Sequence, residues 1–80
     1  MANYLAITNT AVNFGSGSTP FARGRNAVVH NNSGGSLILQ SSDDGTTYAT
    51  LATVADKAFA EVVIAPYMKV STAATLHLIV

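Results

Sequence analysis

Few side chains in this 80-residue chain could take part in catalysis or hold a metal ion. The two histidines, His30 and His77, are far apart in sequence, and no carboxylate stands at ligand spacing from either. Cysteine is absent, which excludes disulfides and thiolate metal sites. Asp43 and Asp44 are adjacent in a predicted tight turn, where neighbouring side chains diverge into solvent. The sequence therefore predicts no metal and no cofactor.

The motifs that usually mark an active site are also missing. A catalytic site needs a nucleophile, a base or a metal in a pocket. The sequence contains no nucleophile elbow, no zinc-binding helix motif and no phosphate-binding loop. The glycine-rich stretch 15–17 lacks the later glycine or lysine that phosphate binding requires, so a flexible loop over 15–20 is the better interpretation. We expect that the protein is not an enzyme.

Two arginines in a glycine-flanked loop suggest contact with a partner. Arg23 and Arg25 lie beside Phe21, and they are the only charged residues of segment 1–42, whereas segment 43–80 carries a net charge of −2. Arginine makes forked hydrogen bonds to carboxylates and is enriched at interfaces. Phe21, Arg23 and Arg25 are therefore candidate partner-binding residues, with a solvated loop as the alternative. A net charge of zero does not indicate nucleic acid.

Composition points to association with other protein chains. Charged residues make up 10% of the chain, against roughly 25% in ordinary soluble proteins. Apolar residues reach 49%, yet no run approaches the length of a membrane span. A small domain buries a modest core and usually needs a disulfide, a metal or a partner. Self-association is the expected source of extra burial, and a monomer with a hydroxyl-rich surface is the alternative.

The pattern of short β-branched runs between turn clusters predicts an all-β protein. We expect one domain over 1–80, a small antiparallel β-sandwich or barrel of roughly seven or eight short strands. Residues 1–26 are predicted to form a partly irregular arm and loop, and residues 27–80 the β core. The expected strands cover 4–8, 11–14, 27–31, 36–41, 48–54, 68–72 and 75–80.

Segment 51–63 allows two interpretations. Its apolar residues fall at helical spacing, but it is rich in β-branched side chains and has no glycine stop before Pro66. A hairpin that turns at residues 55–58 is the prediction, and a helix is the alternative.

Alternation along two strands places isoleucines opposite the predicted core. Ile38 lies between Leu37 and Leu39, and Ile79 follows Leu78, so each isoleucine points to the other face of its strand. Apolar residues on a second face indicate a second buried surface, although single exposed apolar residues are also normal. Ile38 and Ile79 join the candidate partner-binding residues.

A turn motif follows the clearest strand. Ser41, Asp43, Gly45, Thr47 and Tyr48 fit the Asp-box spacing Ser-x-Asp-x-Gly-x-Thr-aromatic. In such a turn the carboxylate accepts backbone N–H groups, the glycine supplies a positive φ and the aromatic ring packs over the turn. In sialidase-like propellers this box is structural and occurs several times. A single copy in 80 residues excludes a propeller, so we predict a structural turn.

The wider sequence around this turn resembles small structural proteins of tailed phages. Residues 37–48 are similar to their Leu-Gln-x-Ser-x-Asp-Gly-x-x-aromatic hairpin, and Tyr67, Lys69 and Val70 are similar to their later Tyr-x-Arg/Lys-Val strand. The resemblance covers residues 36–72. One residue is extra in Ser-Ser-Asp-Asp-Gly relative to Ser-x-Asp-Gly, which leaves open which aspartate has the family's role.

Among these proteins, the chain length is most similar to a capsid decoration (cement) protein. The resemblance implies a structural virion protein on the outer capsid surface, with a homotrimer of itself and the major capsid protein as partners, and neither nucleic acid nor a membrane. Similar hairpins occur in head fibres and tail proteins. A fibre or tail module that binds a carbohydrate or receptor is therefore the alternative.

Overall fold

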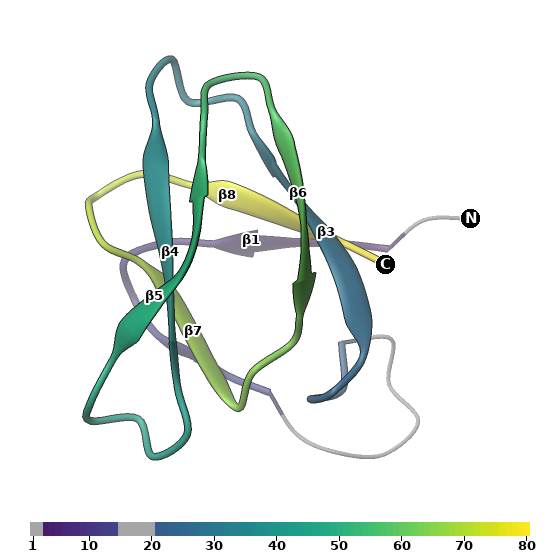
Figure 1. Cartoon of the computed structure of the whole chain (residues 1–80), viewed down its shortest axis with the longest axis vertical. Helices are drawn as coiled ribbons and strands as arrows, with labels where there is room; N and C mark the ends of the chain where they lie inside the picture. Colours follow the sequence, from purple (N-terminus) through teal and green to yellow (C-terminus); the bar gives the residue numbers. More distant parts are fainter. Residues whose placement is uncertain (1–2, 15–20) are drawn as a thin grey trace.

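The computed structural model describes residues 3–14 and 21–80, which form eight strands and no helix (Figure 1). The predicted loop over 15–20 lies outside the described residues. No helix in the described part is long and apolar enough to cross a membrane. The strands are β1 (Tyr4–Ile7), β2 (Val12–Asn13), β3 (Asn26–Asn31), β4 (Leu37–Ser42), β5 (Ala49–Val54), β6 (Phe59–Val63), β7 (Tyr67–Val70) and β8 (Leu76–Ile79).

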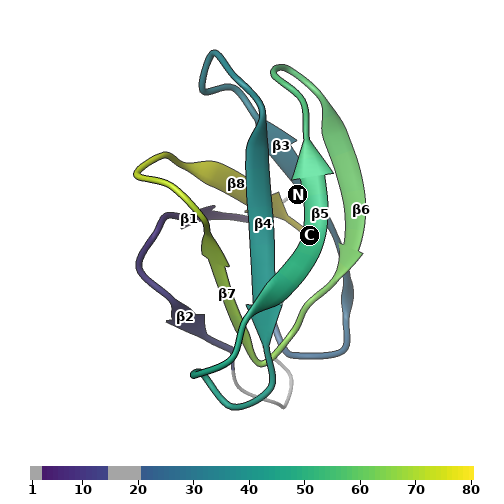
Figure 2. The ribbon, with the colours of Figure 1, turned by 60° about the vertical axis from the view of Figure 1, so that its left-hand side comes forward.

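The strands form two four-stranded antiparallel sheets, which confirms the predicted β-sandwich (Figure 2). Sheet A has the order β1-β8-β3-β6, and sheet B has the order β2-β7-β4-β5. The first strand pairs with the last, the second with the seventh, the third with the sixth and the fourth with the fifth. The chain is therefore one long antiparallel ribbon, folded so that successive pairs enter alternate sheets. This strand order is that of a jelly roll.

The core lies between the two sheets and follows the alternation of each strand. Leu37 and Leu39 are buried on β4 while Ile38 points outward, as the sequence predicts. Leu76 and Leu78 are buried on β8 in the same way. The other large, fully buried apolar side chains are Ile7, Val29, Val54, Ile64, Met68 and Val70.

The N-terminal segment belongs to this core. β1 pairs with β8 in sheet A, and β2 pairs with β7 in sheet B. Ile7 is fully buried, and Phe14 packs in the same cluster. Residues 1–26 were predicted to form a partly irregular arm and loop. They instead supply one edge strand to each sheet, so the core starts well before residue 27.

The chain turns at residues 55–58 as predicted, but the strands on either side do not form a hairpin. The Ala58 N–H donates to the Ala55 carbonyl over 3.0 Å. Lys57 has a φ of 62° at the third position of this turn, where a type II turn needs a positive value. β5 pairs with β4 and β6 pairs with β3, so the turn carries the chain from sheet B to sheet A.

A buried asparagine holds this corner together. The side chain of Asn31, the last residue of β3, is fully buried. Its Nδ2 donates to the Gly35 carbonyl over 2.7 Å and to the Val54 carbonyl over 2.8 Å. Its Oδ1 accepts from the Ser33 backbone N–H over 3.0 Å and from the Ser33 hydroxyl over 2.7 Å. Both donors and both acceptor positions of the amide are therefore used, and they join the β3–β4 connection to the end of β5.

Candidate functional site

The tip of the ribbon, between β4 and β5, is a hydrogen-bonded turn built by Ser42 and Asp44. The Asp44 Oδ1 accepts from the backbone N–H groups of Thr46 over 2.9 Å and Thr47 over 3.0 Å, and from the Ser42 hydroxyl over 2.9 Å. The Ser42 Oγ accepts from the N–H groups of Asp44 and Gly45. Gly45 has a φ of 79°, the left-handed conformation that glycine adopts without strain.

The two polar side chains of the turn lie one position later than predicted. Ser42 and Asp44 make the bonds that the Asp-box spacing assigns to Ser41 and Asp43, whereas Gly45 and Thr47 take their expected places. The reason is that the carboxylate directly before the glycine reaches the N–H groups that follow the glycine. The bonding pattern is thus Ser-x-Asp-Gly, so the structural aspartate is Asp44.

The ring that covers the turn is Tyr67 of β7, where Tyr48 was predicted. A Cβ built on Gly45 would lie 3.1 Å from Cε1 of Tyr67. Tyr48 is half-buried, and the Lys69 Nζ lies 4.3 Å from the centre of its ring, a cation–π contact. The Tyr48 hydroxyl is buried without a hydrogen-bond partner in the described part of the chain. The turn is therefore held by residues from two neighbouring strands.

Asp44 makes the stability of the turn dependent on pH. The N–H groups of Thr46 and then Thr47, followed by the Ser42 hydroxyl, lower the pKa of Asp44 from 3.8 to about 2. A carboxylate with a lower pKa in the folded state stabilises the fold above its unfolded pKa, and this stabilisation is lost as the pH falls toward the folded pKa. We expect Asp44→Asn to flatten the decline in melting temperature between about pH 4 and pH 2.

The matched control for this prediction is the adjacent aspartate. Asp43→Asn should keep the wild-type profile in thermal melts followed by circular dichroism, and Asp44→Ala should lower the melting temperature at pH 7. If Asp43→Asn flattens the profile and Asp44→Asn does not, the assignment of the structural aspartate is wrong.

The outer face of sheet A is apolar and aromatic. Tyr4 is 67% exposed, Phe59 is 63% exposed and Val63 is 52% exposed. The rings of His30 and Phe59 stack with their centres 4.2 Å apart. Glu61 is the only charged residue among the strand residues that alternation places on this face. They are Tyr4, Ala6, Asn26, Val28, His30, Phe59, Glu61, Val63, His77 and Ile79.

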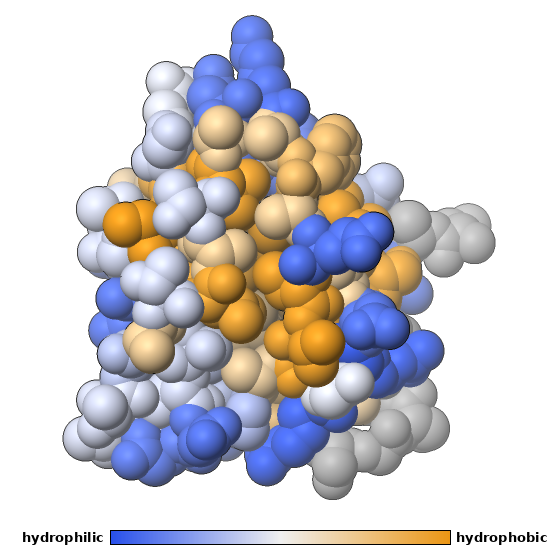
Figure 3. Space-filling model, in the orientation of Figure 1, coloured by the Kyte–Doolittle hydropathy of each residue, from blue (hydrophilic) through white to orange (hydrophobic). Residues whose placement is uncertain are grey.

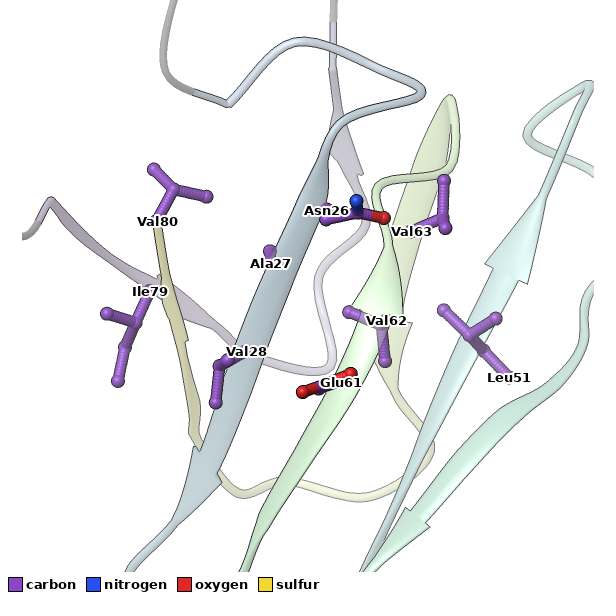
Figure 4. Close-up of a pocket in the computed structure, with 9 residues that line it drawn as sticks. All are labelled: Asn26, Ala27, Val28, Leu51, Glu61, Val62, Val63, Ile79 and Val80. Carbon is purple, nitrogen blue, oxygen red and sulfur yellow. The ribbon is translucent and has the colours of Figure 1, made fainter.

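An open groove of about 840 Å³ runs along this face to the edge of sheet B (Figure 4). Its walls are mainly aliphatic, with Asn26 and Glu61 as the polar groups, and Figure 3 shows apolar side chains gathered over β6 and between β5 and β6. Leu51 reaches the groove because β5 bulges there: Leu39 pairs with Ala52, and the next residue of β4 pairs with Thr50. The lining residues are Asn26, Ala27, Val28, Leu51, Glu61, Val62, Val63, Ile79 and Val80.

The outer face of sheet B is more polar. Gln40 pairs with Thr50 on one side and with Lys69 on the other, and Ile38 pairs with Thr53. Ile38 is 38% exposed. The sandwich therefore has one apolar and one polar outer face.

The five predicted partner-binding residues do not form one surface. Phe21 is half-buried against the core. The Arg23 Nε donates to the Phe14 carbonyl over 3.1 Å, so this side chain bonds to the residue that follows β2. Arg25 is exposed, and its backbone carbonyl accepts from the Ile64 N–H. Ile38 and Ile79 lie on different sheets, and of the two only Ile79 lies on the apolar face.

The most exposed rings of the apolar face, Tyr4 and Phe59, were not predicted as surface residues. Phe59 and Glu61 point outward while Ala60, between them, points inward, but the helical spacing of segment 51–63 obscures this alternation. Tyr4 alternates with Leu5, which packs on the core, so alternation around Tyr4 was a usable signal.

Comparison with protein-family models, with curated proteins and with solved structures gives no match to this chain. In residues 3–14 and 21–80, no three histidine or acidic side chains are grouped so that they could hold a metal ion. The features that bear on function are therefore the apolar face of sheet A, its groove and the turn at the tip of the ribbon.

Proposed function

We propose that the protein is a structural virion protein, a capsid decoration (cement) protein that binds the outer capsid surface and stabilises the shell. The observation that carries this proposal is the apolar outer face of sheet A, where two aromatic rings are each more than 60% exposed. A surface rich in exposed apolar and aromatic side chains, with one charged residue, has the composition of a protein–protein interface. The proposal includes self-association, for which the resemblance implies three copies.

Two further features support a phage structural role. The turn at the tip of the ribbon follows the Ser-x-Asp-Gly spacing of the phage hairpin that residues 36–72 resemble. The jelly-roll strand order occurs in viral capsid domains. The argument from the jelly-roll strand order is an analogy of fold alone, and one fold supports many functions.

A fibre or tail module that binds a carbohydrate is the second candidate. Exposed aromatic rings form the platforms on which sugar rings pack, and Tyr4 and Phe59 supply two of them. Glu61 and Asn26 are polar groups near the same face, and jelly rolls also occur in lectins.

A pelleting experiment tests the proposed function. Purified protein is mixed with empty capsids of the virus that encodes it, the capsids are pelleted, and the bound protein is quantified across a salt titration. We expect saturable binding, which Arg23→Ala combined with Arg25→Ala weakens most at low salt because arginine–carboxylate contacts are screened by salt.

The Arg23 side chain also donates to the Phe14 carbonyl, so the variant's melting curve must match that of wild type before its binding is compared. Lys57→Ala, at the opposite corner of the sandwich, is the matched control for loss of a positive charge. Protein that stays in the supernatant but binds a glycan array would replace the capsid function with the carbohydrate-binding one.

A further inference from the structure

The register of sheet A makes its outer face complementary to a second copy of itself. The register of the four strands places Tyr4, Ile79, Val28 and Glu61 opposite one another in one row. Ala6, His77, His30 and Phe59 form the adjacent row in the same strand order. In each row a large side chain stands at one edge of the sheet, with a smaller or polar side chain at the other edge.

We propose that two copies of this chain pair face to face through the outer faces of their A sheets. A two-fold axis parallel to the strands places β1 of one copy opposite β6 of the other, and β8 opposite β3. Tyr4 then faces the partner's Glu61, with its hydroxyl positioned to donate to the carboxylate, and Ile79 faces the partner's Val28. In the second row the exposed Phe59 ring faces the partner's Ala6, which leaves room for it.

The contact is large enough for a specific dimer. Tyr4 and Phe59 are each roughly two thirds exposed. The exposed surface area of each residue is therefore about 100–150 Å². With the aliphatic side chains and the two histidines, each copy would bury on the order of 500 Å², so the pair reaches about 1,000 Å², the lower limit for a specific interface. Two twisted sheets also pack naturally in this way, with their strands within about 30° of each other.

The distribution of charge favours this face over the other. Glu61 is on β6, an edge strand, so it stays at the rim of the contact, where it remains hydrated. The outer face of sheet B presents Lys69, Gln40 and hydroxyl side chains, which would have to lose water on pairing. We therefore expect a second copy to cover the outer face of sheet A.

Sedimentation equilibrium with charge variants tests the pairing. Wild type at micromolar concentration should sediment at twice the 8.2 kDa mass of the chain. Tyr4→Glu places two carboxylates opposite each other and should raise the dissociation constant at least about tenfold. The combined variant Tyr4→Glu with Glu61→Lys should restore the dimer, because opposite charges then meet across the contact.

Restoration can come only from a second copy. Within one chain, Tyr4 and Glu61 are three strand spacings apart, about 14 Å. Thr53→Glu, which adds the same charge to the outer face of sheet B, is the matched control and should leave the dimer intact. A wild-type monomer, a trimer, or a dimer unaffected by Tyr4→Glu would overturn the pairing. The inference rests on the self-association part of the proposed function and sets its copy number at two, where the resemblance implies three. Capsid pelleting is scored separately, because it measures binding to the capsid whatever the oligomeric state.

Discussion

Asn31→Ala is expected to lower the free energy of unfolding by about 3 kcal/mol. The substitution removes four hydrogen bonds at a fully buried position and leaves the carbonyls of Gly35 and Val54 without these donors. A buried polar group that loses its partner costs about 1–3 kcal/mol. The two carbonyls come from both sides of the corner that joins the sheets, so the loss loosens β3, β4 and β5 together.

Urea denaturation followed by circular dichroism measures this effect. Asn26→Ala is the matched control, because Asn26 is exposed at the other end of the same strand, and it should change stability by less than about 0.5 kcal/mol. Asn31→Asp keeps the acceptor for Ser33 but removes both Nδ2 donors and buries a charge, so it should be at least as destabilising as Asn31→Ala. Equal losses for Asn31→Ala and Asn26→Ala would contradict a structural role for the buried amide.

Strands and turns were predictable because they depend on local patterns. Leu37 and Leu39 alternate with Ile38, and the structure buries the leucines and exposes the isoleucine. The turn at residues 55–58 was also placed correctly. The pairing of the next strand was not predicted, because β5 pairs with the preceding β4 whereas β6 pairs with β3, which lies far away in sequence. Local sequence indicates where a strand ends, but not which sheet the next strand joins.

The candidate site was less predictable than the fold. Asn31 shares the face of Ala27 and Val29, so alternation alone places it in the core, but its four bonds depend on the corner geometry. The bulge that directs Leu51 into the groove contains no glycine or proline, so the sequence gives no signal for it. Tyr4 and Phe59 come from the two edge strands of sheet A, and strand order decides that they share one face.

The shift from Asp43 to Asp44 shows a further limit of spacing. Both aspartates satisfy a known turn pattern, one as Ser-x-Asp-x-Gly and the other as Ser-x-Asp-Gly. The choice depends on which carboxylate lies over the N–H groups of Thr46 and Thr47. The positive φ at Gly45 does not distinguish the two aspartates, because either spacing requires it.

Gly45→Ala is expected to lower the free energy of unfolding by about 2–3 kcal/mol, for two separate reasons. The φ of 79° at Gly45 belongs to the left-handed region, where an alanine is strained by about 1–2 kcal/mol. The new Cβ would also lie 3.1 Å from Cε1 and 3.2 Å from Cζ of Tyr67, closer than ordinary van der Waals contact. Tyr67 is half-buried in β7, so its ring must move together with the turn.

Gly24→Ala separates the two reasons. Gly24 has a similar φ of 85°, but a Cβ built there has no atom within 4 Å, so this variant carries the backbone strain alone. Chemical denaturation of both variants should therefore show a larger loss for Gly45→Ala, by about 1 kcal/mol. Adding Tyr67→Ala should cancel that difference, because the ring that meets the Cβ is gone. Equal losses of unfolding free energy for the two glycine variants would mean that the Tyr67 ring moves away from the new Cβ without cost. The turn at the tip of the ribbon would then be held by Asp44 and Ser42 alone.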